Sequence, residues 1–346
     1  MSVMHVTAQV RPSELSICDK QARPGPAAES ALTHGSGGEL DLGRRTVLSP
    51  LRYPGGKRRL VPYVASAIRA NGLEPDVFVE PFAGGASVSL ELASIGVVRS
   101  IGIADIDPWV ASFWETVFGD CDWLCRRVEA MEINLATWDR LKRMRAKSRR
   151  WQALACLYLN RTSFNGVLHK RAGPIGGRGQ SSEYDLACRF PRERLIKRLR
   201  ACEQLATDGK IAWVRCDTAG KVISDARQHA QSENREIFFY LDPPFWAKSR
   251  ALYRFGFRDF EHEELAESLL WLREPWLLSY DVAPEIAELY RRHDGQQANV
   301  ELLYTATRRT AYEELVVTNL SRLPADTRLW RTNGEWRQLR RAGPSH

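Results

Sequence analysis

The sequence predicts an α/β fold built on an open sheet whose strands end at acidic residues. Short apolar runs alternate with stretches of helical periodicity along most of the 346 residues, a pattern typical of strands that alternate with helices. Five of these runs end on, or directly before, an Asp or Glu; they lie at 76–80, 100–104, 210–216, 238–241 and 276–280. Because ligands bind at the carboxyl ends of strands in open α/β sheets, we expect a polar site there.

The N-terminal region is poor in apolar residues. Residues 1–48 are rich in Pro, Gly, Ala and Ser and have no sustained hydrophobic period, which predicts a disordered tail. Order begins at a glycine turn over 53–57, followed by a helical pattern over 58–70. Glycines let the backbone approach a ligand, and Lys57 can pair with a carboxylate; a plain Pro-Gly turn fits equally well.

The first strand leads into a glycine loop. A strand at 76–80, a loop at 81–86 and a helix at 87–95 form the first half of a nucleotide-binding βαβ unit. The fingerprint G-x-G-x-x-G is absent and no P-loop lysine follows, which disfavours bound phosphates and a nucleotide-dependent oxidoreductase. A short acidic glycine loop fits an adenosyl group joined to an amino acid. Asp105, at the end of the next strand, is expected to hold ribose hydroxyls.

The positive charge is concentrated in one stretch. The formal net charge is +8, whereas residues 121–215 carry 21 Lys and Arg against 9 Asp and Glu, a net charge of +12 that leaves −4 for the rest. Charge segregated on an irregularly helical stretch is typical of a nucleic-acid-binding face; a solvated helix face is the alternative. Within it, Arg161 and Asn165 can read base edges or cap a helix.

The rest of the chain returns to the sheet pattern. Helices are expected at 219–231, 261–273 and 284–292, and the runs at 300–304 and 315–320 are expected to pair as an antiparallel hairpin.

These elements predict a catalytic domain formed by residues 49–120 and 211–325. An inserted target-recognition region is expected at 121–210 and a C-terminal tail at 326–346.

The stretch 238–246, Phe-Phe-Tyr-Leu-Asp-Pro-Pro-Phe-Trp, is the most informative in the chain. A brief aromatic run bounded by proline predicts a buried strand with Asp242 at its carboxyl end. Two prolines stiffen the backbone, so the Asp242 carboxylate, the Pro243 carbonyl and the Phe245 ring form a preorganised site. Such a site suits a planar heterocycle with an exocyclic amine. A strand that ends in an ordinary Asp-Pro turn is the alternative.

Cysteine usage and hydropathy indicate a soluble, cytoplasmic protein. The seven cysteines lack paired metal-ligand spacing and are expected to be reduced thiols. No His or Cys cluster offers a metal site, no apolar run is long enough to span a bilayer, and the N-terminus has no signal-peptide pattern.

Four motifs in this order resemble the adenine-specific DNA methyltransferases of the Dam-like (D12) family. They are the Gly-Gly-Lys turn at 53–57, the loop at 80–85, Asn-Arg-x-x-x-Asn-Gly at 160–166, and Asp-Pro-Pro-aromatic at 242–245. The resemblance covers about residues 50–320. It implies a seven-stranded, Rossmann-like sheet of the S-adenosylmethionine-dependent methyltransferases, with a reversed last hairpin and an inserted helical target-recognition region.

The resemblance also implies roles for individual residues. Tyr53 and Lys57 would lie at the methionine end of the donor, S-adenosylmethionine, and Asp217 near its adenine. The donor pocket would comprise Glu80, Pro81, Phe82, Gly84, Gly85 and Asp105. The catalytic residues would be Asp242, Pro243, Pro244 and Phe245. The residues expected to bind DNA are Lys142, Arg143, Arg145, Arg161, Asn165, Lys170, Arg171 and Arg178.

The activity implied is transfer of a methyl group to the N6 amine of an adenine flipped out of duplex DNA. The family usually has tyrosine where this chain has Phe245, so stacking is kept and a hydroxyl is lost. The alternatives are an RNA substrate, a cytosine amine, or a DNA-binding relative without catalysis. A monomer and a partner restriction endonuclease are both compatible with the sequence, which decides neither and does not give the recognition sequence.

Overall fold

The computed structural model describes residues 48–145, 147–246, 253–292, 296–306, 308–324, 331–332, 335–336 and 340–341. All but the last residue of the predicted tail at 1–48, and most of the predicted C-terminal tail, therefore lie outside the described residues.

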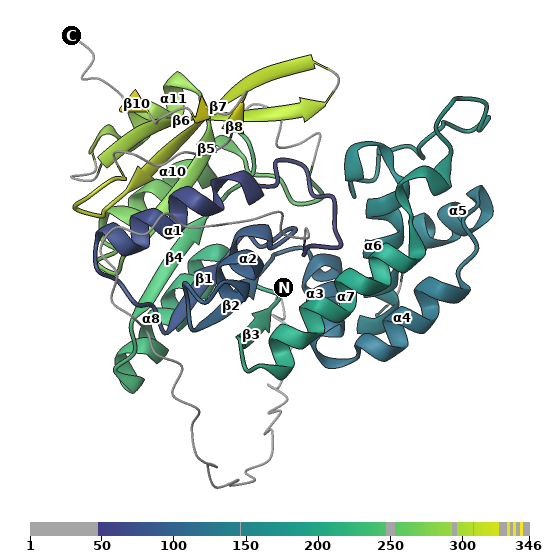
Figure 1. Ribbon diagram of the computed structural model, residues 1–346, viewed down its shortest axis with the longest axis horizontal. Coiled ribbons are helices and arrows are strands. Elements are labelled where there is room, and N and C mark those ends of the chain that lie inside the picture. The colour runs from purple at the N-terminus through teal and green to yellow at the C-terminus, as the bar shows by residue number, and fades with distance from the viewer. Residues whose placement is uncertain are drawn as a thin grey trace, which may run out of the picture. The chain divides into compact units, whose positions relative to one another are not determined.

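The core of the fold is one mixed sheet (Figure 1), with the strand order β10-β6-β7-β5-β4-β1-β2-β3. Its parallel strands are β1 (Val77–Glu80), β2 (Ser100–Ala104), β3 (Ile211–Arg215), β4 (Ile237–Leu241) and β5 (Trp276–Asp281). The hairpin of β6 (Gln296–Ala306) and β7 (Arg308–Thr318) closes one side, with β7 antiparallel to β5. The strands β1 to β7 confirm the predicted seven-stranded sheet with a reversed last hairpin, to which the two-residue strand β10 is added at the edge.

Short strands complete the described structure. β10 (Arg340–Arg341) pairs with β6 at the edge of the main sheet, and β8 (Arg331–Thr332) pairs with β9 (Glu335–Trp336).

The strand order reverses its direction at β1. The chain runs outward from β1 through β2 to β3, then returns to β4 on the other side of β1. The loops that leave β1 and β4 therefore diverge, and a crevice forms at the carboxyl ends of these two strands. The glycine loop follows β1 and Asp242 follows β4, so the topology brings two of the sequence motifs to one place.

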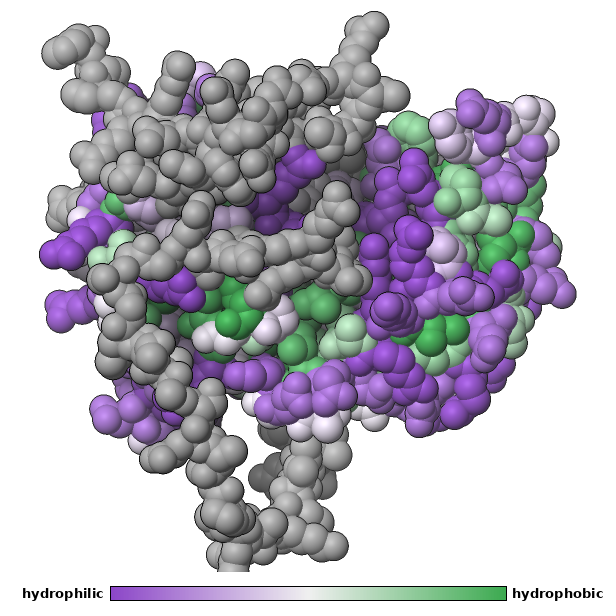
Figure 2. Space-filling view, in the orientation of Figure 1, coloured by the Kyte–Doolittle hydropathy of each residue, from purple (hydrophilic) through white to green (hydrophobic). Residues whose placement is uncertain are grey.

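The inserted stretch is helical, as expected. It contains α4 (Cys121–Ala130), α5 (Leu135–Arg143), α6 (Arg149–Thr162) and α7 (Arg192–Thr207), with the short 3-10 helices η2 (Phe164–Gly166) and η3 (Leu186–Arg189). The helices α6 and α7 both contact α3 (Pro108–Gly119), which in turn contacts β3. In Figure 2 the surface of these inserted helices is largely hydrophilic, with hydrophobic residues between. A separate recognition domain stays a prediction.

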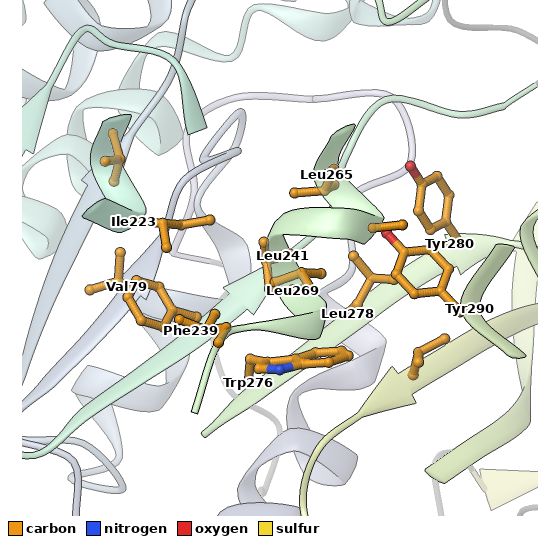
Figure 3. Close-up of a cluster of buried hydrophobic side chains, with 14 of the residues drawn as sticks. Val79, Ile223, Phe239, Leu241, Leu265, Leu269, Trp276, Leu278, Tyr280 and Tyr290 are labelled. Atoms are coloured by element: carbon orange, nitrogen blue, oxygen red, sulfur yellow. The ribbon is translucent and has the colours of Figure 1, made fainter. Parts of the chain in front are cut away.

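A continuous apolar cluster covers one face of the sheet (Figure 3). Alternate strand residues such as Val79, Phe239 and Leu278 meet α8 (Ala219–Glu233), α10 (Asp259–Leu270), α11 (Pro284–Leu289) and the 3-10 turn η4 (Tyr290–Arg292). Because side chains alternate across a strand, the neighbours Phe78 and Phe238 point to the other face. There they stack with ring centroids 5.5 Å apart.

The second face carries the N-terminal helices. The 3-10 helix η1 (Arg58–Leu60) and α1 (Val61–Ala70) pack against α2 (Ser87–Ser94), which contacts β1 and β2. Burial on both faces explains why β4 reads as a continuous apolar run.

The sequence left two features of this fold unpredicted. The hairpin strands begin at Gln296 and Arg308, earlier than the predicted 300 and 315, because their outer residues lack the hydrophobic pattern that marked the inner ones. Helix α3 follows Asp107, which caps it by accepting from the Trp109 amide at 2.9 Å.

Candidate active site

A cavity of about 350 Å³ lies at the carboxyl ends of the strands. Seven predicted site residues line it together: Tyr53, Pro81, Phe82, Asp105, Asp217, Asp242 and Pro244. Its other walls include Ile106, Phe255 and Phe257. The cavity is thus mostly apolar with a few carboxylates, as small-molecule sites usually are.

Two side chains hold Asp242, and a third supports one of them. Its Oδ1 accepts from Lys57 Nζ at 2.9 Å and from Ser279 Oγ at 3.1 Å. The Tyr240 hydroxyl lies 2.8 Å from Ser279 Oγ and completes the chain. Among the described residues no donor reaches Oδ2. Burial raises the pKa of Asp242 above its ordinary value, although Lys57 opposes the shift.

Lys57 contacts the Asp242 carboxylate and is not among the residues that line the cavity. Its side chain is buried, and Nζ donates to the Gly55 carbonyl at 3.0 Å and lies 3.7 Å from Glu314 Oε1. Burial alone would lower the pKa of Lys57, but Asp242 and Glu314 outweigh burial and raise it. The predicted contact with the methionine end of a donor stays a prediction.

Sequence reasoning missed Ser279 and Glu314. Ser279 interrupts a buried, largely apolar strand, and that interruption is a signal that could have found it. Glu314 directly follows the exposed Glu313 at the start of an apolar run, so the pattern gave no such signal for it. Their partners could not be read, because these depend on the order of β7, β5 and β4 in the sheet.

The Gly-Gly-Lys turn packs against the aromatic residue after the two prolines. Gly55 has a φ of +74°, and a Cβ there would lie 2.6 Å from Phe245 Cζ. Lys57 Nζ lies 5.2 Å from the centre of the Phe245 ring. Pro243 and Pro244 are buried and Phe245 is half-buried, so the Asp-Pro-Pro-Phe segment is fixed by both its own prolines and the turn.

The glycine loop packs on Tyr53. Gly84 has a φ of +44°, and a Cβ there would lie 2.6 Å from Tyr53 Cδ1; at Gly85 it would lie 3.3 Å from Tyr53 Cβ. The Gly84 amide donates to Asp105 Oδ2 at 2.9 Å, and its carbonyl accepts from Trp114 Nε1 at 2.9 Å. The first motif and the glycine loop therefore form one structural unit.

Asp105 is a buried carboxyl at the end of β2. It accepts the amides of Gly84 and, at 2.8 Å, Asp107. Burial and the nearby Asp107 raise the pKa of Asp105 to about 7. Asp107 itself pairs with Arg254 at 2.8 Å, which ties the segment after the prolines to this edge of the sheet.

Glu80 lies apart from the cavity. Its Oε2 accepts from the hydroxyl and, at 3.3 Å, the amide of Ser89 on α2. Burial raises the pKa of Glu80 to about 8, and the Ser89 hydroxyl partly opposes the shift. The described contacts thus join β1 to α2, and a contact with the donor stays a prediction.

A second cavity, of about 570 Å³, brings five predicted DNA-binding residues together: Lys142, Arg143, Lys170, Arg171 and Arg178. Lys142 and Arg178 lie over the Trp138 ring, 5.2 and 5.3 Å from its centre. Burial, with the charge of Arg254, lowers the pKa of Lys142 to about 8. Arg145 is exposed and lies outside this cavity.

The contact of Arg161 with DNA stays a prediction. Its side chain is buried and donates to the Arg189 carbonyl at 2.7 Å. Burial and neighbouring arginines, first Arg52 and then Arg198, lower the pKa of Arg161 to about 9. The sequence left open whether Arg161 reads base edges or caps a helix, and its buried hydrogen bond supports a structural role.

Asn165 and its neighbour point outward. Asn165 is exposed with a φ of +53°, and Phe164, which sequence reasoning passed over, has 65% of its surface exposed. Contact of either residue with DNA stays a prediction.

Other predictions concern thiols, metals and membranes. The six cysteines among the described residues are free. Within the described part of the chain, no group of three or more His, Cys, Asp or Glu side chains could hold a metal ion. No helix in that part is both long and apolar enough to cross a membrane.

A parallel sheet with a reversed last hairpin, and with its cavity where the strand order reverses, is the class I methyltransferase fold. The family model for D12 class N6 adenine-specific DNA methyltransferases matches residues 53–310. The chain therefore belongs to this family, and the resemblance drawn from the four motifs is confirmed. Among curated proteins, none matches the chain.

Proposed function

We propose that this protein is a site-specific methyltransferase that transfers a methyl group to the N6 amine of an adenine in duplex DNA. The observation that carries the proposal is the Asp242 carboxylate at the end of β4. One oxygen is held by Lys57 and Ser279, and the other faces no described donor. A carboxylate held in this way can accept a hydrogen from an exocyclic amine.

S-adenosylmethionine fits the first cavity as methyl donor. The volume lies within the usual range for small-molecule sites, about 300–1,000 Å³. Ile106, Phe255 and Phe257 offer an apolar wall for an adenine ring, and Asp105 and Asp217 offer carboxylates for ribose hydroxyls and the adenine edge. When bound, the donor supplies a methyl group on a positively charged sulfur.

The target adenine must leave the base stack to reach Asp242, which costs a few kcal/mol. The Phe245 ring, held by the Gly55 turn, gives the extruded base a flat surface for stacking. The hydroxyl of the more usual tyrosine is absent, but the stacking surface remains, so we expect activity.

Asp242 also assists the chemistry. An aromatic amine is a weak nucleophile because its lone pair is delocalised into the ring. By accepting a hydrogen of the amine, Asp242 favours tetrahedral geometry at nitrogen, and it takes the proton once the new bond has formed.

The second cavity supports binding to the DNA backbone. Its Lys and Arg side chains are suited to phosphates, which position the duplex without reading sequence. Phe164 and Asn165, exposed beside the inserted helices, are suited to contact the bases.

The proposal is tested with purified protein, unmethylated duplex DNA and S-adenosylmethionine, with methylated nucleosides identified by mass spectrometry. Wild type is expected to yield N6-methyladenine. Asp242→Ala should yield none while it binds DNA with unchanged affinity, whereas Asp208→Ala, an exposed Asp at the end of α7, should match wild type. Methylcytosine as the product, structured RNA as the better substrate, or turnover by Asp242→Ala would refute the assignment.

A further inference from the structure

Two buried ionisable groups, Lys57 and Glu314, meet the half-buried Asp242 beside the cavity. Lys57 Nζ lies 2.9 Å from Asp242 Oδ1 and 3.7 Å from Glu314 Oε1. The Lys57 side chain is 2% exposed and that of Glu314 is 8% exposed. One ammonium is thus shared by two carboxylates, although it can neutralise only one of them.

The reversed strand explains how Glu314 reaches this place. β7 runs antiparallel to β5, and Glu314 lies directly opposite Asp281, the last residue of β5. A parallel strand would carry the first part of its sequence at the other edge of the sheet. Because β7 is reversed, a residue in its middle lies at the edge where the parallel strands end.

Among the described residues, Lys57 is the one ion-pair partner of Glu314. Its Oε2 is buried, and none of the described residues donates a hydrogen bond to it. A buried carboxylate without donors is costly unless a cation faces it, so the described structure leaves Lys57 to balance this charge. The other ionisable groups close enough to influence Glu314 or its partners are Asp281, Glu80, Tyr240, Tyr253 and Tyr280.

The charge balance of the cluster allows one extra proton. With Lys57 protonated and both carboxylates ionised, the net charge is −1. Burial raises the pKa of Glu314 to about 7, with Lys57 opposing the shift and Asp242 adding to it. Protonation of either carboxylate makes the cluster neutral, because the other one remains paired with Lys57.

We propose that Glu314 is a positioning residue that becomes the counter-ion of Lys57 when Asp242 accepts the proton of the methylated amine. The proposal rests on the proposed function and adds a residue to it. Without Glu314, protonation of Asp242 would leave a buried ammonium unpaired, and Asp242 would be a weaker base.

The step balances in atoms and charge. The lone pair of the adenine amine forms the new N–C bond, and the sulfur keeps the electron pair of the broken S–C bond. The nitrogen then carries a positive charge and passes one proton to Asp242. Asp242 becomes neutral, Lys57 stays ionised, and Glu314 provides its counter-charge until Asp242 returns the proton to water.

The test compares Glu314→Gln with Glu313→Gln, which removes an exposed carboxylate one residue earlier on the same strand. The first measurement is made on the donor-free proteins, in which ¹³C NMR of labelled Asp side chains follows the titration of Asp242. We expect Glu314→Gln to lower the pKa of Asp242 by about one unit, because repulsion from Glu314 is gone. Glu313→Gln should leave it unchanged.

The second measurement is the single-turnover rate of methyl transfer against pH. For Glu314→Gln we expect the rise in rate on the acid side to move to lower pH and the plateau to fall about tenfold, because the base is weaker. A lower plateau with no shift of the Asp242 pKa would overturn the proposal, since loss of packing alone gives that result. Should Glu314→Gln not fold, Glu314→Asp is expected to give a smaller shift in the same direction, and no shift would overturn the proposal.

The two proposals fail in different ways. If wild type does not methylate adenine, the proposed function is wrong, while the NMR titration still tests the coupling of Glu314 to Asp242. If wild type methylates adenine and the titration of Asp242 is the same in both variants, only the role of Glu314 is wrong.

Discussion

At the scale of single residues, the site depends on two glycines, because a larger side chain at either position would displace an aromatic ring of the site. Gly55 leaves room for Phe245, and Gly84 leaves room for Tyr53. Both glycines have positive φ angles, so each is required twice, once by its backbone and once by its neighbour. The aromatic rings of the site are thereby set by a backbone that approaches them closely.

A comparison of Gly55→Ala with Gly72→Ala should separate the effect of the positive φ angle from the effect of the contact with Phe245. Gly72 also has a positive φ, +64°, but no atom lies within 4 Å of a Cβ there. Both variants should lose about 1–2 kcal/mol of stability from backbone strain. Only Gly55→Ala should displace Phe245 and reduce the single-turnover rate, by about 100-fold. Equal rates for the two variants would show that the contact with Phe245 is unimportant.

Glu80 predicts a pH dependence of stability. Its pKa in the folded protein is about 8, above its ordinary value of 4.5, so the folded state holds a proton that the unfolded state releases between these values. Stability therefore falls as pH rises through this window. Glu80→Gln should be more stable than wild type at pH 8.5 by about 1–3 kcal/mol, and nearly equal to it at pH 4.5.

Urea unfolding at several pH values measures this difference. Glu129→Gln, a change at an exposed position on α4, serves as the control and should show no such trend. A constant difference between Glu80→Gln and wild type would contradict the assignment of a buried, protonated carboxyl.

At the scale of elements, the apolar runs of the sheet were readable because burial on both faces leaves a continuous signal. Strand β4 and the residues after it were placed from sequence alone. The contacts of the site were less readable: Lys57 and Glu314 are far apart in the chain, and only the sheet order joins them. The burial of Arg161 was not readable, because a basic residue on a helix looks alike in sequence whether it is buried or exposed.

Asn160 joins two of the motifs. Its amide accepts from the Arg52 amide at 2.7 Å and donates to the carbonyls of Arg52 at 3.2 Å and Gly166 at 2.8 Å. The residue is fully buried. The segment that leads into Tyr53 is therefore fastened to the loop that presents Phe164 and Asn165.

Asn160→Ala should cost about 2–4 kcal/mol of stability, because buried backbone groups would lose their partners. Asn71→Ala removes four hydrogen bonds, three of them exposed, and should cost about 1 kcal/mol or less because water can replace the lost partners. Urea unfolding gives both values, and hydrogen exchange should show faster opening at 163–167 in Asn160→Ala only. Equal costs would mean that Asn160 does not fasten the loop.

At the scale of the whole molecule, charge is divided between the two parts of the chain. Residues 121–215 carry a net charge of +12 and the rest carries −4, and part of the positive charge lines the second cavity. Changing Lys142, Arg143 and Arg145 to Glu should weaken DNA binding and flatten its dependence on salt.

A matched control is the reversal of Arg69, Arg99 and Arg235, which are exposed outside the inserted stretch. It alters the net charge equally and should change affinity far less. Titration of labelled duplex at several salt concentrations measures both variants. If the two sets behaved alike, net charge rather than the inserted face would govern binding.

The central claim, that this chain methylates adenine through Asp242, is tested most directly by single-molecule sequencing of DNA. The DNA is taken from a methylation-free host that expresses either wild type or Asp242→Ala. We predict methylated adenines at one recurring sequence in the wild-type sample and none in the other. Unmodified DNA in both samples, with soluble protein present, would contradict the claim, as would equal methylation in both.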